Sequence, residues 1–185
     1  MLVVTYNPEW PNHFKEISEK LFDKLNHLNI AIEHIGSTSI KGLAAKPIID
    51  IDIVYQANHH FESIKEVLTL VDYLHHGDQG ILGREVFKRS NLEGDDVLDK
   101  IMHHLYVCEQ NCDELNNHLF FRDQLRKNTS AKKCYQELKF SIAAEANNDR
   151  KKYAAIKEVK ANAFIKYVIE LEKLEQNTNN EPNSR

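Results

Sequence analysis

The chain of 185 residues has little of several residue types, and each shortage excludes a class of protein. Only six glycines and four prolines are present, which excludes collagen-like and low-complexity chains. The three cysteines, Cys108, Cys112 and Cys134, are an odd number and are interpreted as reduced thiols rather than a disulfide framework. No run approaches the roughly 18–20 apolar residues that cross a bilayer.

Targeting signals and two common catalytic motifs are also missing. The start, MLVVTYNPEW, lacks a basic segment followed by a long apolar one, so no signal peptide is predicted and the cytoplasm is the expected compartment. No G-x-S-x-G or G-x-x-x-x-G-K-[ST] motif occurs, which argues against α/β-hydrolase and P-loop chemistry. Hydrophobic residues make up 42% of the chain, enough for one globular domain with a real core.

Charge is distributed unevenly along the chain, although the formal net charge is only −4. Residues 1–121 carry 10 Lys/Arg against 19 Asp/Glu, residues 122–160 carry 11 against 5, and residues 161–185 carry 3 against 4. The basic middle segment is either a solvated helix face or one wall of an anion-binding cleft. Because the whole chain has no basic excess, binding to nucleic acid is not expected.

Hydrophobic periodicity predicts an α+β fold, with a small mixed sheet, flanking helices and a helical C-terminal part. Helices are predicted at residues 12–28, 61–73, 113–127, 132–147 and 151–174. Strands are predicted at residues 30–35, 47–54, 84–89 and 101–108, with an acidic loop at 91–100. The predicted organisation is a core over 1–112, a helical part over 113–175 packed on it as one structural unit, and a disordered tail over 176–185.

The segment from Glu33 to Tyr55 carries the residues that suggest chemistry. Its first feature is a strand that ends at Gly36-Ser37, where glycine permits a sharp turn and a close ligand approach. Ser37 is expected to cap a following short helix, whose free N–H groups would suit a phosphate. The alternative is an ordinary corner between a strand and a helix.

The second feature is an apolar strand that contains Asp50 and Asp52. Residues two apart on a strand point to the same face, so the two carboxylates are expected about 6–7 Å apart at Cα. Oxygen ligands at that spacing suit Mg²⁺, which shares its coordination shell with water and substrate phosphates. The alternative is an edge strand with a wet polar face. The separation of 13 residues from Ser37 lets the turn and the strand converge on one cleft.

Gly36-Ser37 followed by Asp50-Ile51-Asp52 resembles the signature of the DNA polymerase β-like nucleotidyltransferase superfamily. The stretch HIGSTSIKGLAAKPIIDI resembles the GrpB-like family more closely, and the likeness extends over roughly residues 5–170. This resemblance implies a nucleotidyltransferase-like fold and a nucleoside triphosphate as substrate or ligand, bound with Mg²⁺. The acceptor of a transferred nucleotidyl group would be a small molecule or a protein.

The resemblance also assigns roles to individual residues. Asp50 and Asp52 would bind one or two Mg²⁺ ions and thereby support in-line attack at the α-phosphate. The phosphate-binding residues implied by the turn and by nearby cations are Gly36, Ser37, Thr38, Lys46, Arg84, Arg122 and Arg126. Arg122 and Arg126 are four residues apart on one predicted helix face, so that they could reach one anion, although a salt-bridged surface face is the alternative.

One departure from the superfamily pattern concerns a third carboxylate on the adjacent strand. The expected strand reads IMHHLYVC and contains no Asp or Glu. His104 stands at the position nearest to that role and is a candidate catalytic base. Glu33 and the pair Asp95-Asp96 are the other carboxylates considered, without support from their spacing.

The missing carboxylate motivates a second hypothesis, a catalytically inactive phosphate- or nucleotide-binding accessory module. GrpB-like domains can occur fused to dephospho-coenzyme A kinase, which suggests a link to coenzyme A metabolism. A homodimer is also considered, because an apolar stripe on the last helix would suit either a dimer face or packing on the parent domain. The stripe comprises Tyr153, Ile156, Phe164, Val168, Leu171 and Leu174.

Overall fold

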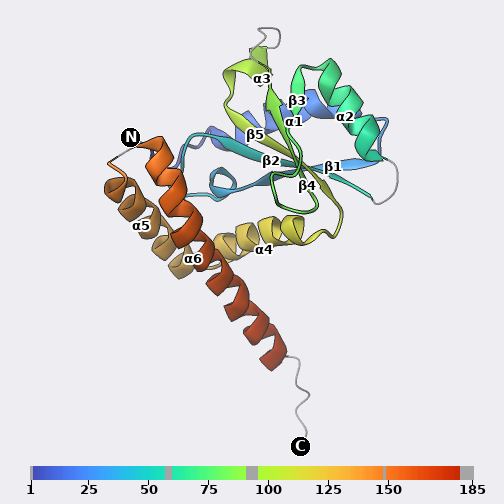
Figure 1. The fold of residues 1–185 in the computed structure, drawn as a ribbon. Helices are drawn as coiled ribbons and strands as arrows, with labels where there is room; N and C mark the ends of the chain where they lie inside the picture. Colours follow the sequence, from blue (N-terminus) through green and yellow to red (C-terminus); the bar gives the residue numbers. More distant parts are fainter. Residues whose placement is uncertain (1, 57–59, 91–95, 148, 180–185) are drawn as a thin grey trace, which may run out of the picture.

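The chain forms the α+β fold that its sequence predicts, as shown by a computed structural model (Figure 1). The structure describes residues 2–56, 60–90, 96–147 and 149–179. Its strands are β1 (Ile30–Ile35), β2 (Ile49–Tyr55), β3 (Tyr73–His75), β4 (Arg84–Arg89) and β5 (His103–Glu109). Its helices are α1 (Trp10–Leu25), α2 (His60–Leu70), α3 (Asp96–Lys100), α4 (Asp113–Lys127), α5 (Thr129–Glu145) and α6 (Arg150–Asn179). A 3₁₀ turn, η1 (Ser37–Ser39), joins β1 to the segment before β2.

The five strands form one mixed sheet in the order β1-β2-β5-β4-β3. Strands β2 and β5 are parallel, and the other neighbouring pairs are antiparallel. Because side chains alternate along a strand, Ile49, Ile51 and Ile53 point to one face, whereas Asp50 and Asp52 point to the other. The sheet therefore separates an apolar face from a polar one.

The main hydrophobic core lies on the apolar face, beneath α1, α2 and α3. The core residues of α1 are Trp10, Ile17, Leu21 and Leu25, which recur at helical spacing. They pack against isoleucines of β2 and against Phe87 and Leu105 of β4 and β5. This packing fixes β2 in the middle of the fold, so the two aspartates are held by a rigid strand.

The polar face is crossed by α4, and the last two helices pack beside it (Figure 1). Helices α5 and α6 share small apolar clusters with Val3 near the N-terminus and with Ile40, Leu43 and Ala44 of the segment between η1 and β2. The C-terminal helices thus support the segment that follows the Gly36 turn.

Among the described residues, no helix has the length and apolar character needed to cross a bilayer.

Most predicted elements are present, but several boundaries differ. Helix α1 begins at Trp10 and ends at Leu25, and α5 begins at Thr129, three residues earlier than predicted. Neither β3 nor α3 was predicted, since three and five residues are too few to show a period. Residues 91–95 of the predicted acidic loop lie outside the described residues, whereas 96–100 form α3.

The C-terminal helix is longer than its sequence pattern indicates. Helix α6 continues to Asn179, so residues 176–179 of the predicted tail are helical, and 180–185 lie outside the described residues. The first part of its apolar stripe packs on the same chain. Tyr153 and Ile156 contact the cluster around Ala44, and the ring of Phe164 stacks on Tyr135 at 5.3 Å. The side chains of residues 171–179 lie outside the description.

Candidate functional site

The candidate site is built on the polar face of β2, where Asp50 and Asp52 point toward α4. Asp50 is paired in register with His104 of β5, and Asp52 with Tyr106. The Asp50 side chain is 28% exposed, whereas that of Asp52 is 0% exposed. The two carboxylates share a face as predicted, but only Asp50 is open to solvent.

The turn at Gly36 lies directly against Asp50. Gly36 has φ +66°, and a Cβ atom built there would lie 2.2 Å from the Asp50 Oδ2 atom. Only a residue without a side chain allows that approach. The predicted convergence of the turn and the strand is therefore present in the fold.

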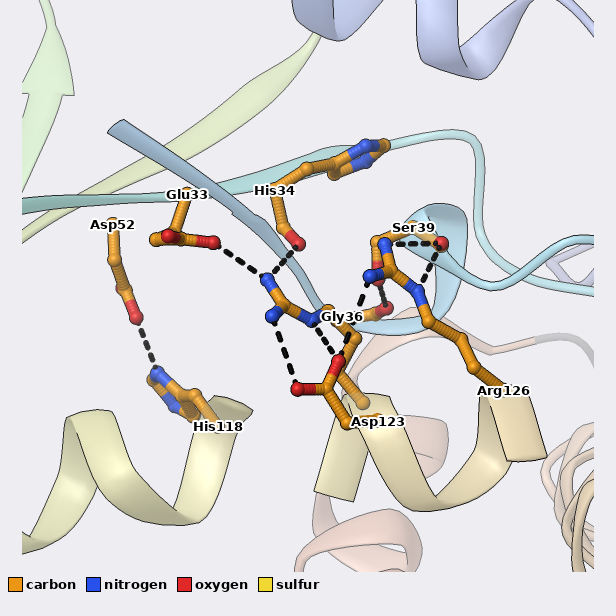
Figure 2. Close-up of polar contacts among 9 residues, drawn as sticks. Glu33, His34, Gly36, Ser39, Asp52, His118, Asp123 and Arg126 are labelled. Atoms are coloured by element: carbon orange, nitrogen blue, oxygen red, sulfur yellow. Dashed lines mark hydrogen bonds and ion pairs between the residues drawn. The ribbon is translucent and has the colours of Figure 1, made fainter. Parts of the chain in front are cut away.

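The hydroxyl groups of the turn are engaged within the chain. Ser37 does not cap η1, contrary to prediction, because the turn has only three residues and the Ser37 side chain bonds to Tyr135 instead. Thr38 is buried and its hydroxyl lies 3.0 Å from His34 Nε2. Ser39 donates to the carbonyl of Gly36, as Figure 2 shows. These contacts give the turn a defined shape, and they leave the Thr38 hydroxyl directed inward.

Each aspartate carboxylate contacts a histidine ring nitrogen. His104 Nδ1 lies 2.9 Å from Asp50 Oδ1, and the His104 side chain is 53% exposed. His118 of α4, which the sequence interpretation missed, places Nδ1 2.9 Å from Asp52 Oδ2 (Figure 2). Its Nε2 atom lies 3.2 Å from Glu114 Oε1. Glu114 is in turn 3.4 Å from Arg84.

Burial and these contacts shift the pKa values of the pair around Asp52. Burial raises the pKa of the Asp52 carboxyl, and the hydrogen bond from His118 opposes that shift. Burial alone lowers the pKa of His118, but its hydrogen bonds to Asp52 and Glu114 outweigh burial and raise it to about 9. The pKa of Glu114 is lowered, chiefly by its hydrogen bond to His118. The geometry therefore holds His118 as a cation between two carboxylates.

The two predicted arginines on α4 contact the turn and its strand. Arg122, with a side chain 11% exposed, lies 2.7 Å from Glu33 and 2.8 Å from Asp123. Arg126 donates to the carbonyl of Ser39 at 2.9 Å and is 43% exposed (Figure 2). Glu33, considered above as a third carboxylate, is thus occupied by Arg122. Arg126 is the more accessible cation beside the turn.

The other predicted phosphate clamps lie in different places. The Lys46 ammonium lies 4.1 Å from the centre of the Tyr153 ring of α6, so it contacts the C-terminal helix. Arg84 lies over the Tyr106 ring at 4.8 Å and pairs with Glu114. Asp95 lies outside the described residues. The fold thus links Arg84 to the aspartates through α4 but shows no contact of Lys46 with them.

The two missed residues, Glu114 and His118, share a sequence signal with the two predicted arginines. Glu114, His118, Arg122 and Arg126 follow one another at intervals of four on α4. Residues four apart share one face of a helix, so this stripe could have been identified as the face that covers the aspartates. Which partner each of these four residues contacts depends on how α4 crosses the sheet.

The residues present fit a Mg²⁺ site that a substrate completes. Asp52 Oδ1 is buried and has no hydrogen-bond partner, so an oxygen ligand is available. Among the described residues, no group of three or more His, Cys, Asp or Glu is arranged to hold a metal ion. Mg²⁺ in proteins often takes one or two carboxylates and fills its shell with water and phosphate oxygens. The remaining ligands would come from nucleotide and water.

An open pocket of about 790 Å³ adjoins His104. It lies where β4 and β5 stop pairing, beyond Phe87 and Leu105. Its lining includes Arg84, Lys88, Met102, His104 and Tyr106. Space for a molecule therefore exists beside His104.

Comparisons with known proteins agree with this fold. The family model described as GrpB protein matches residues 1–170. UPF0157 protein YqkA of Bacillus subtilis is 36% identical over 143 residues, which are 77% of this chain and 40% of that protein. The chain therefore spans less than half the length of that relative. A dephospho-CoA kinase of Mycolicibacterium paratuberculosis is 26% identical over 174 residues, 84% of this chain and 43% of that protein.

Two solved structures show the same architecture. Conserved protein GrpB from Enterococcus faecalis matches with a TM-score of 0.74 and 28% identity, over 92% of this chain and 98% of that one. Cid1 in complex with its short product ApU matches with a TM-score of 0.51 and 12% identity, over 77% of this chain and 43% of that one. At that identity the second match shows a likeness of fold alone.

Proposed function

The chain belongs to the GrpB protein family, and on that premise we propose that it binds a nucleoside triphosphate with Mg²⁺ at the Gly36 turn and the β2 aspartates. The observation that carries the proposal is the contact between the turn and Asp50, where a Cβ on Gly36 would lie 2.2 Å from the carboxylate. A turn that admits phosphates and a carboxylate that ligates a metal are thereby side by side. Cid1, which is similar in fold, was solved in complex with its short product ApU, and this supports a nucleotide as the ligand.

Each group at the site has a role in this proposal. Asp50 and Asp52 hold Mg²⁺, which when bound aligns an acceptor group with the α-phosphate and offsets the charge that develops there. The turn from Gly36 to Ser39 lets the β- and γ-phosphates approach the backbone. Arg126, anchored at the turn and 43% exposed, supplies positive charge.

His104 is proposed as the general base for the acceptor. Its Nδ1 atom is directed at Asp50, so Nε2 is the nitrogen that remains to accept a proton. The pocket beside it has room for an acceptor, a small molecule or a side chain of a protein. Transfer of a nucleotidyl group, with release of pyrophosphate, is the reaction that this arrangement supports.

The binding proposal is tested by thermal denaturation with ATP, GTP, CTP and UTP, each with and without Mg²⁺. Saturating ligand at about 100 times its Kd adds about 2.7 kcal/mol, which for a chain of this size raises Tm by roughly 5–10 °C. Asp50→Asn combined with Asp52→Asn should abolish the rise. Asp23→Asn, at an exposed position on α1, is the matched control. Absence of a response to every nucleotide would contradict the proposal.

A second candidate function is binding without turnover, in an accessory role. Two observations favour it: β5 contains no carboxylate beside Asp50, and Asp52 is fully buried in its pair with His118. The similarity to a dephospho-CoA kinase suggests a connection with coenzyme A metabolism. Incubation with α-labelled triphosphates and a cell extract separates the two functions. Metal-dependent release of pyrophosphate with a labelled product supports transfer, whereas binding alone supports the accessory role.

A further inference from the structure

His118 contacts a carboxylate through each of its ring nitrogens. Nδ1 lies 2.9 Å from Asp52 Oδ2 and Nε2 lies 3.2 Å from Glu114 Oε1. Ionised carboxylates only accept hydrogen bonds, so both ring nitrogens must donate and the ring must carry a positive charge. His118 therefore acts as an internal cation on the polar face of the sheet.

The cation is part of an alternating chain of charges. Arg84 pairs with Glu114, Glu114 with His118, and His118 with Asp52. The Asp52 side chain is 0% exposed, so water cannot solvate its charge. A buried carboxylate requires a partner of opposite charge, and His118 is that partner in this structure.

The second oxygen of Asp52 has no such partner. Asp52 Oδ1 is buried and without a hydrogen bond. A divalent cation held by this oxygen and by Asp50 would therefore share one carboxylate group with the His118 ring. Two cations on one carboxylate repel each other strongly where water is excluded.

We propose that His118 is a built-in counter-cation that competes with the divalent metal for Asp52. This inference rests on the proposed function, since it concerns the same metal. His118 neutralises Asp52 in the absence of ligand and lowers the affinity of the site for a free metal ion. A metal that arrives bound to a triphosphate is part of a complex whose net charge is negative. The repulsion between the metal and the His118 ring therefore weakens binding most for the bare ion. His118 is thus a positioning residue that makes metal binding depend on nucleotide.

The test measures binding of Mn²⁺ alone, from the electron paramagnetic resonance signal of the free ion, at one fixed neutral pH. In His118→Asn the amide nitrogen takes the place of Nδ1, so the donor to Asp52 remains but the charge is lost. This variant should bind Mn²⁺ at least tenfold more tightly than the wild type. His27→Asn, at an exposed position beyond α1, should bind as the wild type does.

Two further variants separate charge from structure. His118→Lys retains a positive charge and should bind Mn²⁺ as weakly as the wild type. If circular dichroism shows that His118→Asn does not fold, His118→Gln takes its place. His118→Gln should also bind Mn²⁺ more tightly than the wild type. Equal or weaker binding by the uncharged variants overturns the inference, and so does tight binding by His118→Lys.

Failure of this inference is distinguishable from failure of the proposed function. If the wild type responds to Mg²⁺ with nucleotide while His118→Asn binds Mn²⁺ no more tightly, only the role of His118 is overturned. If neither protein binds a metal with or without nucleotide, both proposals are overturned. Asp50→Asn combined with Asp52→Asn, added to His118→Asn, should remove the gain in Mn²⁺ affinity.

Discussion

At the scale of single residues, the site depends on a glycine that no other residue can replace. Gly36 has φ +66° and ψ −171°, a region that residues with a side chain almost never adopt. The carboxylate of Asp50 also occupies the space that a Cβ would need. Backbone conformation and close approach thus require glycine independently.

Gly36→Ala should destabilise the protein by about 3 kcal/mol, because backbone strain and a clash add together. Gly42→Ala is a matched control, since Gly42 has φ +80° but nothing within 4 Å of an added Cβ. It should cost only about 1 kcal/mol, from backbone strain alone. Urea denaturation measures both values. Equal losses in the two variants would show that the contact with Asp50 contributes nothing.

His34 is a second residue whose burial has a measurable consequence. Its ring stacks on Phe14 with centroids 4.5 Å apart and bonds to Thr38. Burial lowers the pKa of His34 from 6.5 to about 4. The folded protein thus holds this ring neutral at pH values where the unfolded chain takes up a proton.

Stability should therefore fall as the pH drops from 6.5 toward 4, since the unfolded chain binds the proton first. Between pH 7 and pH 4.5 the shift corresponds to about 2 kcal/mol, at 1.36 kcal/mol for each pKa unit. His34→Gln retains a hydrogen-bonding amide but cannot titrate. Its free energy of unfolding should lose about 2 kcal/mol less than the wild type over that range. Parallel pH profiles for the two proteins would refute this assignment.

At the scale of elements, α4 organises the polar face. Its four polar residues at intervals of four reach four different elements: Arg84 of β4, Asp52 of β2, Glu33 of β1 and the backbone of Ser39 in η1. A helix that lies across a sheet meets successive strands along its length. This geometry lets α4 carry a separate partner for each strand and for the turn.

Arg122→Gln should destabilise the protein by about 2 kcal/mol, because it leaves the Glu33 carboxylate and a backbone carbonyl without their donor. The double variant with Glu33→Gln should recover part of that loss, since residue 33 then carries no charge that needs the Arg122 partner. Lys133→Gln is the control, because Lys133 and Glu137 form an exposed pair at 4.0 Å that contributes less than about 0.5 kcal/mol. Chemical denaturation of the wild type, Arg122→Gln, Glu33→Gln and the double variant measures the coupling. Additive effects of the two substitutions would mean that the pair is not coupled.

At the scale of the whole molecule, the proposal is that the sheet and the C-terminal helices form one structural unit. The N-terminal segment pairs with the loop before β2 through a β-bridge between Val4 and Ala45. Its neighbour Val3 belongs to the same buried apolar cluster as Tyr153 of α6. The N-terminal segment and the first turn of α6 therefore share a core with the segment that follows the Gly36 turn. Cores shared in this way favour a single cooperative unfolding transition.

Tyr153→Ala should destabilise the whole protein by about 3 kcal/mol, because Tyr153 is 1% exposed. The single tryptophan, Trp10, lies in the core under the sheet and reports on the other half of the molecule. Its fluorescence transition in urea should shift as far as the circular dichroism transition does. Tyr167→Ala, at a position 57% exposed on the same helix, should cost less than about 0.5 kcal/mol. A Trp10 midpoint that stays unchanged in Tyr153→Ala would indicate two independent units.

Much of the architecture follows from local patterns. The bounds of β1, β4 and α4 agree with those predicted, because alternation and helical periodicity are properties of consecutive residues. The short elements β3 and α3 could not be predicted in this way, because they contain too few residues to show a repeating pattern. Ser37 was expected to cap a helix, and it bonds instead to Tyr135, which lies about a hundred positions away in the chain.

The order of the residues was enough to place Asp50 and Asp52 on one face of a buried strand, because the period of a β-strand is a local property. It also determined that a glycine turn precedes them. Which histidine contacts each carboxylate depends instead on how the elements pack against one another. His118 lies 66 positions after Asp52, and its approach depends on the packing of α4 across the sheet, which no local period encodes.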